Sequence, residues 1–194
     1  RAMLERKDLW SLEEYSEKRD AFRAEVLQHK ENRRVLLGRH VLLIFENQLT
    51  IKYQIQEMLR IEKTFESAGI QEELDAYNPL IPDGDNWKCS MLIQYPDVTE
   101  RKARLSDLVD IENRVWVKIA DSAKVFAIAD EDLERSNDEK TSAVHFLRFQ
   151  FNAEQVSALQ SGGSITFGID HDNYPAHDFV VTESVRQALA EDVT

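Results

Sequence analysis

Cysteine is almost absent from this sequence, since Cys89 is the only one among 194 residues. A single thiol excludes an internal disulfide, and it excludes a Cys-X-X-Cys redox pair, a cysteine-rich zinc site and an all-cysteine iron–sulfur cluster within one chain. We therefore expect a reducing, cytoplasmic compartment. The only basic neighbour of Cys89 in the sequence is Lys88, which favours a buried, unreactive thiol over a nucleophile.

Long apolar runs and an excess of basic charge are lacking as well. No run reaches the roughly 18 apolar residues of a transmembrane helix, and we expect no signal peptide. Lys and Arg number 24 against 36 Asp and Glu, which gives a net charge of −12. A basic face is needed to meet the phosphates of a nucleic acid or an anionic membrane. We therefore expect neither nucleic acid nor a membrane as a partner.

Several sequence motifs of common enzyme classes are missing too. The sequence contains no GxGxxG or Walker pattern, and it contains neither GxSxG nor HExxH. Glu-x-x-His, which a di-iron helical bundle uses in pairs, is absent in the same way. The chain is therefore not expected to be a rubrerythrin-like oxidase, and no nucleotide-binding loop is indicated.

What is present indicates one domain with a sizeable core. Hydrophobic residues make up 42% of the chain, and this length is typical of a single domain, here 1–194. The loop-like stretch 77–87, rich in Pro, Gly, Asn and Asp, is too short to separate two domains. We interpret it as an ordered surface loop.

Two long helices are predicted near the N-terminus. Ser11 followed by Glu14 is a capping-box pattern that opens a helix running to about residue 33. Asn47 caps a second helix, roughly over 49–67, which stops at Gly69. Between the two helices, the apolar runs 34–37 and 40–46 predict a hairpin.

The remainder of the chain predicts mainly strands, with short helices between them. Residues 115–120 and 124–130 are joined by a tight connection that predicts another hairpin. The other predicted strands are 89–95, 143–151 and 164–170, and the short helices are 98–109, 152–163 and 182–192. The expected fold is α+β, with an antiparallel or mixed sheet of about six to seven strands and the two long N-terminal helices packed on one face.

A charged residue interrupts the apolar stripe of the second helix. Glu62 follows Met58 by four residues and Ile55 by seven, so it falls on their face, with Gln54 on the flank. An unpaired buried carboxylate costs several kcal/mol, so Glu62 is expected to have a partner, a proton or a metal.

The first helix shows a comparable face. Tyr15, Arg19 and His29 lie on it at helical spacing among apolar residues, and Arg23 lies beside it. If the helices pack together, Arg19 or Arg23 reaches Glu62. The arrangement is then either a structural ion pair with a partly exposed helix face or a polar pocket.

Histidine supplies a second candidate site. Residues 170–178 contain two imidazoles and three carboxylates directly after a predicted strand, and such groups suit zinc, iron or manganese. Asp170, His171 and His177 are the candidate metal ligands, and a polar turn is the alternative interpretation. His145 shares a strand face with Leu147, Phe149 and Phe151, which favours a hydrogen-bonded core or sheet-end histidine over a metal ligand.

Three stretches combine polar runs with apolar strands or helices in an unusual way: LLIFENQLTIKYQIQEMLRIEK (42–63), AYNPLIPDGDNWK (76–88) and KTSAVHFLRF (140–149). Together they resemble the bacterial domain-of-unknown-function family 3501, and the resemblance covers nearly the whole chain. It implies no established activity and transfers no catalytic residue. By association with rubrerythrin-like and iron–sulfur oxidoreductase genes, it suggests a role in redox metabolism.

Three functions stay open at this point. The first is an accessory module that binds a small molecule or a protein partner. The second is a metal-dependent enzyme or metal-binding protein with ligands among Glu57, Glu62, His29, His145, His171 and His177. The third is a metal-free enzyme with Glu62 as a buried general base. The pocket candidates are Tyr15, Arg19, Arg23, His29, Gln54, Glu57, Arg60 and Glu62. The cofactor stays unknown, and an exposed sheet face or edge would permit a homodimer.

Overall fold

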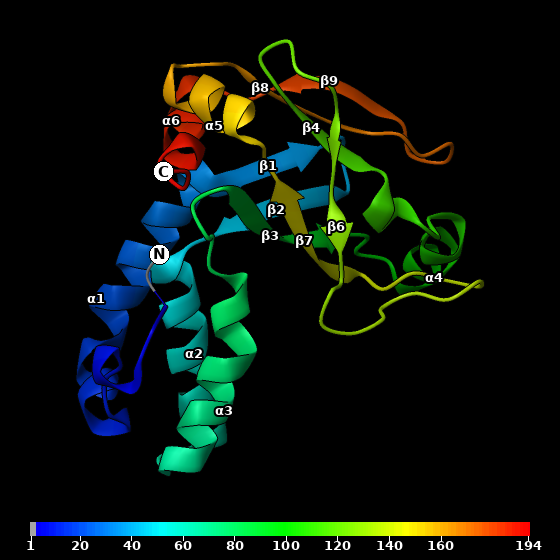
Figure 1. The fold of residues 1–194 in the computed structure, drawn as a ribbon. Coiled ribbons are helices and arrows are strands. Elements are labelled where there is room, and N and C mark those ends of the chain that lie inside the picture. The colour runs from blue at the N-terminus through cyan, green and yellow to red at the C-terminus, as the bar shows by residue number, and fades with distance from the viewer. Residues whose placement is uncertain (1–2) are drawn as a thin grey trace.

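The computed structural model describes residues 3–194, which fold into six α-helices and two antiparallel sheets (Figure 1). The larger sheet has the strand order β1-β2-β3-β7-β6, and the smaller has the order β5-β4-β8-β9. The strands are β1 (Arg34–Leu37), β2 (Val41–Glu46), β3 (Asn86–Ile93), β4 (Val115–Ile119), β5 (Val125–Phe126), β6 (Ile128–Ala129), β7 (Val144–Gln150), β8 (Ile165–Ile169) and β9 (Ala176–Val180). The helices are α1 (Leu12–Lys30), α2 (Gln48–Glu62), α3 (Ser67–Tyr77), α4 (Val98–Asp107), α5 (Ala153–Gln160) and α6 (Glu183–Ala190).

The predicted α+β class is confirmed, but the prediction of a single sheet is wrong. The β4–β5 hairpin forms as expected, with Val117 opposite Val125. The chain then passes from one sheet to the other around the buried Ala127, whose amide donates to the carbonyl of Val115. Ile128 begins β6, which pairs with β7 of the larger sheet. The predicted strand 124–130 is therefore divided between the two sheets, and periodicity within one segment does not reveal such a division.

The two sheets enclose a continuous apolar core. Its centre is aromatic: Phe45 lies 5.6 Å from Trp87 and 5.4 Å from Phe167, measured between ring centroids. These side chains come from alternate positions on β2, β3 and β8, and all are fully buried. Alternation along the strands thus directs one face of each sheet into a shared interior.

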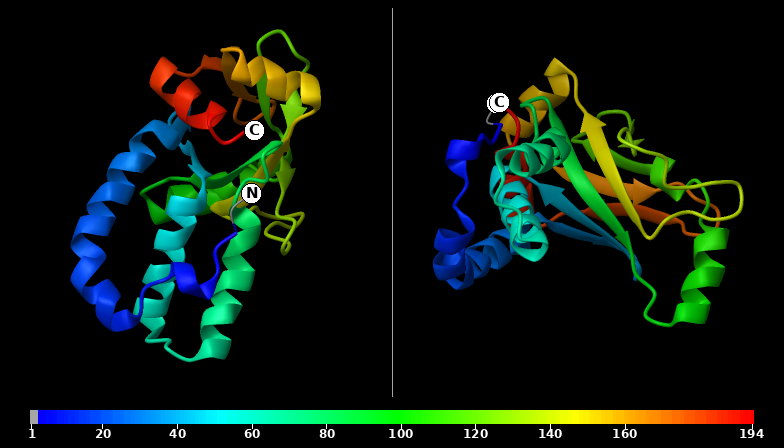
Figure 2. Two further views of the ribbon diagram at one scale, coloured as in Figure 1. Left: turned by 60° about the vertical axis from the view of Figure 1, so that its left-hand side comes forward. Right: turned by 90° about the horizontal axis from the view of Figure 1, so that it is seen from below.

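Helix α2 packs between α1 and α3, and the three helices project from one end of the larger sheet (Figures 1 and 2). We call these helices the helical arm. Ser11 caps α1 through the amide of Glu14, and Asn47 caps α2 through the amide of Thr50. The expectation that the two long helices cover a sheet face is wrong, because their apolar stripes meet each other and α3. The arm has its own apolar clusters, one around Ile55 and Leu74 and one around Phe22.

A buried ion pair ties the C-terminal segment to the base of the arm. The guanidinium of Arg33 donates to the carboxylate of Asp192 and to the carbonyl of Phe45 at 2.8 Å. Arg33 is 2% exposed. Burial raises the pKa of the Asp192 carboxyl, and the neighbouring Arg33 opposes that rise. Helix α6 is thereby held beside the junction of arm and sandwich.

No helix among residues 3–194 combines the length and the apolar character that crossing a membrane requires.

Candidate functional site

The polar side chains of the helical arm meet at Glu57 rather than at Glu62. Tyr15 donates its hydroxyl hydrogen to Glu57 Oε2 at 2.7 Å. Arg19 donates to both carboxylate oxygens at 2.9 Å, and Arg60 donates to Oε1 at 3.3 Å. The hydrogen bond from Arg19 is the main reason that the pKa of Glu57 falls to about 2. Burial, and next to it the bond to Glu57, raises the pKa of Tyr15.

Both oxygens of the Glu57 carboxylate accept hydrogen bonds within the arm. Glu57 accepts two hydrogen bonds from one arginine in the planar, bidentate geometry that is strongest for this pair. Tyr15 is fully buried, and the Arg19 side chain is 29% exposed. We interpret the set as a structural ion pair that fixes α1 against α2, because no oxygen of Glu57 is left to act on a ligand.

The expected burial of Glu62 is wrong. Glu62 is exposed because it is the last residue of α2, where Lys63 turns into a left-handed conformation and ends the stripe. Gln54 and Arg23 are exposed as well. His29 is half-buried, and its Nε2 lies 2.8 Å from the side-chain nitrogen of Asn47.

Sequence reasoning missed Gln56, which is fully buried between α2 and the segment before α1. Its side-chain oxygen accepts from the amide of Trp10 at 2.7 Å, and its nitrogen donates to the Trp10 carbonyl at 3.3 Å. Gln56 lies at the edge of the stripe formed by Ile55 and Leu59, which was the available signal. The pairing attaches the N-terminal segment to the arm.

The metal candidates of residues 170–178 are not brought together. Asp170 accepts from Trp116 Nε1 and from Lys124, both at 2.9 Å, and the bond from Lys124 lowers its pKa most. His171 Nε2 lies 2.8 Å from the carbonyl of Val109. His177 is exposed on β9, a strand that the interpretation of this stretch as a polar turn had missed. Across residues 3–194, no three His, Cys, Asp or Glu side chains form a group that could hold a metal ion.

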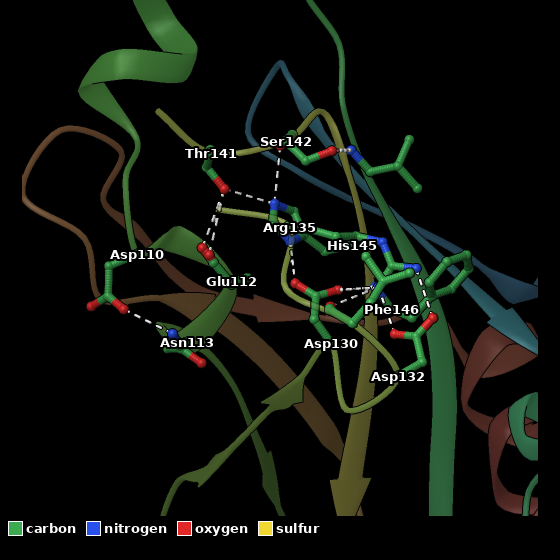
Figure 3. Close-up of polar contacts among 12 residues, drawn as sticks. Asp110, Glu112, Asn113, Asp130, Asp132, Arg135, Thr141, Ser142, His145 and Phe146 are labelled. Carbon is green, nitrogen blue, oxygen red and sulfur yellow. Dashed lines mark hydrogen bonds and ion pairs between the residues drawn. The ribbon is translucent and has the colours of Figure 1, made fainter. Parts of the chain in front are cut away.

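A buried polar cluster lies at the edge of the sandwich, and Figure 3 shows its contacts. His145 is fully buried on β7, as its alternation with Leu147 predicts. Its Nδ1 lies 2.6 Å from Asp130 Oδ2, and its Nε2 lies 2.8 Å from the hydroxyl of Thr141. Thr141 is in turn 3.2 Å from the carboxylate of Glu112. We call these four residues, with Arg135, the His145 cluster.

Both ring nitrogens of His145 lie within hydrogen-bonding distance of polar groups. Nδ1 faces the carboxylate of Asp130, and Nε2 also faces the carbonyl of Ser142 at 3.0 Å. The Thr141 hydroxyl donates to Glu112, whose pKa burial raises. The cluster is therefore a closed chain of paired groups.

The same cluster fixes the loop that follows β6. Arg135 donates to Asp130 at 3.0 Å and to both oxygens of Asp132, and its guanidinium lies 4.7 Å from the centre of the Phe146 ring. Residues 130–139 are rich in acidic side chains, a composition typical of a solvated loop or a turn of helix. The structure shows that Asp130 and Arg135 instead turn back onto β7. The available signal was His145 within an apolar strand.

A groove of about 800 Å³ opens beside this loop. Its floor is the outer face of β3 and β7, with Lys88, Phe146 and Arg148. Tyr77 and Leu80 contribute to the opposite wall, where α3 leads into the 3-10 turn η3 (Asn78–Leu80). In Figure 1, α3 and the yellow-green loop after β6 lie on opposite sides of this part of the sheet.

The groove combines apolar surface with an excess of acidic groups. Lys88 donates to the Pro79 carbonyl at 2.6 Å and pairs with Asp83 at 3.2 Å. Arg148 pairs with Glu131 at 2.8 Å, and Arg135 pairs with Asp132 at 2.6 Å. All three cations of the lining, and three of its five carboxylates, therefore have ion-pair partners within the fold. The acidic lining residues are Asp75, Asp83, Asp85, Glu131 and Asp132, against the basic Lys88, Arg135 and Arg148. A ligand with an apolar part and a cationic group fits such a lining.

Comparison with known proteins adds a family and a solved structure. The family model described as "Protein of unknown function (DUF3501)" matches residues 3–193. A crystal structure from Burkholderia pseudomallei K96243, described as a novel protein of unknown function, is 47% identical and covers 100% of both chains, with a TM-score of 0.95. No curated protein matches the chain.

Proposed function

We propose that this chain, which belongs to the DUF3501 family of proteins of unknown function, is a binding module whose binding site is the groove between α3 and the loop after β6. The observation that carries the proposal is the groove itself, because it joins a cavity of about 800 Å³ to apolar and charged side chains. Sites for ligands are concave, mostly apolar and equipped with a few placed polar groups.

The lining determines the class of ligand. Phe146, Tyr77 and Leu80 offer apolar surface, whereas Asp85 is exposed at the rim. The acidic groups outnumber the basic ones, and the whole chain carries a net charge of −12. Complementary charge speeds association and excludes partners of like charge. The ligand therefore carries an apolar group next to a cationic one.

An accessory role is proposed in preference to an enzymatic one. The two sets of buried polar groups, around Glu57 and around His145, are paired within the fold. The enzymatic alternative needs Glu62 as a buried general base, and Glu62 is exposed at a helix end. The link to redox metabolism is part of this proposal only through the family resemblance.

The test uses n-octylamine, an apolar chain with a cationic head, and octanoate, the matched anion. We expect octylamine to shift the backbone amide resonances of Phe146 and Arg148 in a saturable way in a two-dimensional NMR titration. Octanoate should shift them far less, because the acidic lining repels it. Added salt should weaken the amine, since exposed charges are screened.

A groove variant and a matched control complete the test. Phe146→Ser removes apolar surface from the floor, and we expect it to weaken octylamine binding about tenfold, equivalent to about 1.4 kcal/mol. Phe179→Ser changes an exposed phenylalanine on β9 of the other sheet and should leave binding unchanged. Absence of saturable shifts with either probe, or equal shifts with both, would contradict the proposal.

A further inference from the structure

The His145 cluster holds two buried carboxylates that differ in their partners. Asp130 pairs with Arg135 at 3.0 Å and faces His145 at 2.6 Å. Glu112 is 2% exposed, and its carboxylate accepts from the hydroxyl of Thr141. In the part of the chain that the structure describes, no lysine or arginine pairs with Glu112. Burial of a carboxylate without a cation is costly, so the hydrogen bonds of Glu112 decide its state.

The Thr141 hydroxyl has one hydrogen for two contacts. It lies 2.8 Å from Nε2 of His145 and 3.2 Å from the carboxylate of Glu112 (Figure 3). Each contact needs a hydrogen, and a threonine hydroxyl carries one. The hydrogen on Nδ1 of His145 is already used, because Nδ1 faces the carboxylate of Asp130. A second hydrogen must therefore come from Nε2 or from a protonated Glu112.

Two arrangements supply this hydrogen, and they contain the same number of protons. In the first, Nε2 of His145 donates to the Thr141 hydroxyl, which donates to an ionised Glu112. In the second, a protonated Glu112 donates to Thr141, which donates to Nε2. The extra proton thus belongs to the chain of three groups rather than to one residue. When it leaves, one contact has no hydrogen, and a buried site gains a negative charge.

Burial acts on the cluster in the same direction. It raises the pKa of Glu112 above the ordinary value of 4.5, because the charged form is poorly solvated there, and His145 opposes the rise. The folded cluster therefore binds the proton more tightly than the unfolded chain does. Its stabilising contribution is complete below the unfolded pKa, and it is lost as the pH rises through the folded pKa.

Few other charged groups face the ring of His145. Asp130 and Arg135 face the cluster from the loop after β6, and the residue opposite His145 on β3 is the uncharged Met91. Between about pH 5 and about pH 9, an aspartate ordinarily keeps its negative charge and an arginine its positive charge. The proton that leaves in this range therefore comes from the chain that joins His145 to Glu112.

The cluster holds both ends of the loop after β6. Asp130 begins the loop, and its amide donates to the carbonyl of Phe146 at 2.8 Å. Thr141 ends the loop, and its amide donates to the carbonyl of Leu105 at 2.9 Å. Between these ends lie three residues of the groove lining, Glu131, Asp132 and Arg135. Separation of the cluster therefore frees one wall of the groove.

We propose that the proton shared by Glu112 and His145 is a pH-sensitive latch, which holds the loop after β6 on β7 and releases it as the pH rises. The latch itself needs no ligand. Its effect on binding rests on the proposed function: an open loop removes a wall of the groove, so octylamine binds less tightly at higher pH. The amine keeps its charge up to about pH 9, since a primary amine resembles lysine.

The test measures amide hydrogen exchange of the full chain without ligand, from about pH 5 to about pH 9. Protection factors are compared, because they remove the intrinsic pH dependence of exchange. We expect protection of the Asp130, Thr141 and Ser142 amides to fall at least about tenfold over this range. The Ala120 amide, which donates to the Ser164 carbonyl at 2.9 Å beside the smaller sheet, is the reference and should keep its protection.

Glu112→Gln distinguishes a proton latch from packing alone. The glutamine amide carries hydrogen at every pH, so it donates to Thr141 without an added proton. We expect protection of the loop amides in this variant to be independent of pH. Glu134→Gln makes the same change at an exposed position of the same loop and should leave the pH response of the wild-type chain intact. Urea midpoints of both variants verify that the fold is retained.

Each other outcome overturns a stated part. Protection of the loop amides that is constant or rises with pH in the wild-type chain overturns the latch, and this measurement holds whether or not Glu112→Gln folds. An unchanged pH response in Glu112→Gln overturns the shared proton as its cause. Octylamine that fails to bind at any pH overturns the proposed function and leaves the latch intact. Octylamine binding that weakens with pH in the wild-type chain, and not in Glu112→Gln, supports both.

Discussion

The helical arm and the sandwich differ in where their buried polar groups lie and in what those groups pair with. In the arm, the carboxylate of Glu57 sits between two helices and is held by Arg19 and Tyr15. In the sandwich, aromatic rings fill the centre, and polar groups such as His145 collect at the edge beside a loop. An arm of three helices has too little apolar surface for a large core, so charge-assisted hydrogen bonds define its packing.

The arm and the sandwich also differ in how their polar groups are placed relative to solvent. The buried polar groups of the arm hydrogen-bond to one another, whereas the outer face of the sandwich has exposed apolar residues and an acidic groove. A feature that breaks an apolar pattern in the arm therefore indicates packing.

The largest expected effect compares the two cores directly. Phe167→Ala empties the centre of the sandwich, and we expect it to lower the free energy of unfolding by about 3–5 kcal/mol. Phe22→Ala in the smaller cluster of the arm should cost about half as much, since fewer neighbours surround it. Urea unfolding followed by circular dichroism gives both values.

The same experiment tests whether arm and sandwich are one domain. We expect a single transition in both variants, because Arg33 and Asp192 tie the arm to the C-terminal helix. Two separate transitions in Phe22→Ala would contradict the single domain 1–194.

The next effect concerns the edge of the sandwich. His145→Ala leaves Asp130 and Glu112 in a buried site without the ring between them, and removal of one partner of a buried pair costs about 3 kcal/mol. We expect urea unfolding to show a loss of this size in the free energy of unfolding. His177→Ala, an exposed histidine, is the control and should be neutral. Equal stability of the two variants would show that the His145 cluster does not fix its loop.

A smaller effect, with a pH signature, is expected in the arm. Glu57→Gln should cost about 2 kcal/mol near neutral pH, since it removes the charged acceptor of Arg19. The pKa of Glu57 is depressed in the folded state, to about 2 from 4.5, so its stabilisation is present above the unfolded pKa and is lost as the pH falls. The gap in urea midpoint between wild type and variant should shrink from about pH 5 to pH 2. A gap that stays constant over this range would rule out the ionic contribution.

The smallest effect belongs to the residue that the sequence singled out. Glu62→Gln changes an exposed side chain at a helix end, so we expect a shift within about 0.5 kcal/mol. Measured beside Glu57→Gln, it separates the carboxylate that packs from the one that does not. A loss above 1 kcal/mol would place Glu62 in a contact that its exposure does not suggest.

Much of the fold was predictable from local pattern. The caps at Ser11 and Asn47, the hairpin of β1 and β2 and the strand β7 all lie where the sequence predicts them. These elements depend on interactions between residues a few positions apart, which spacing reveals. The division of 124–130 at Ala127 depends on two sheets that are distant in sequence, so no local pattern shows it.

The candidate site was predictable only in part. Helical spacing placed Tyr15 and Arg19 on a packing face, and the structure brings them to α2. Helical spacing could not determine whether Glu57 or Glu62 would contact Tyr15 and Arg19, because the position where α2 ends decides how far the apolar stripe extends. The groove has no signal in any one segment, since its walls come from α3, β7 and the loop after β6.

The sequence by itself determined most of the helices and strands and which of their residues share a face, because those properties follow from periods of 3.6 and 2 residues. Tertiary structure alone decided which faces meet. It packed the two long helices against each other, paired Arg19 with Glu57, joined His145 to Glu112 through Thr141, and formed a groove between α3 and the loop after β6. The physical reason is that packing and ion pairing act between atoms that are close in space, whereas sequence patterns record closeness along the chain.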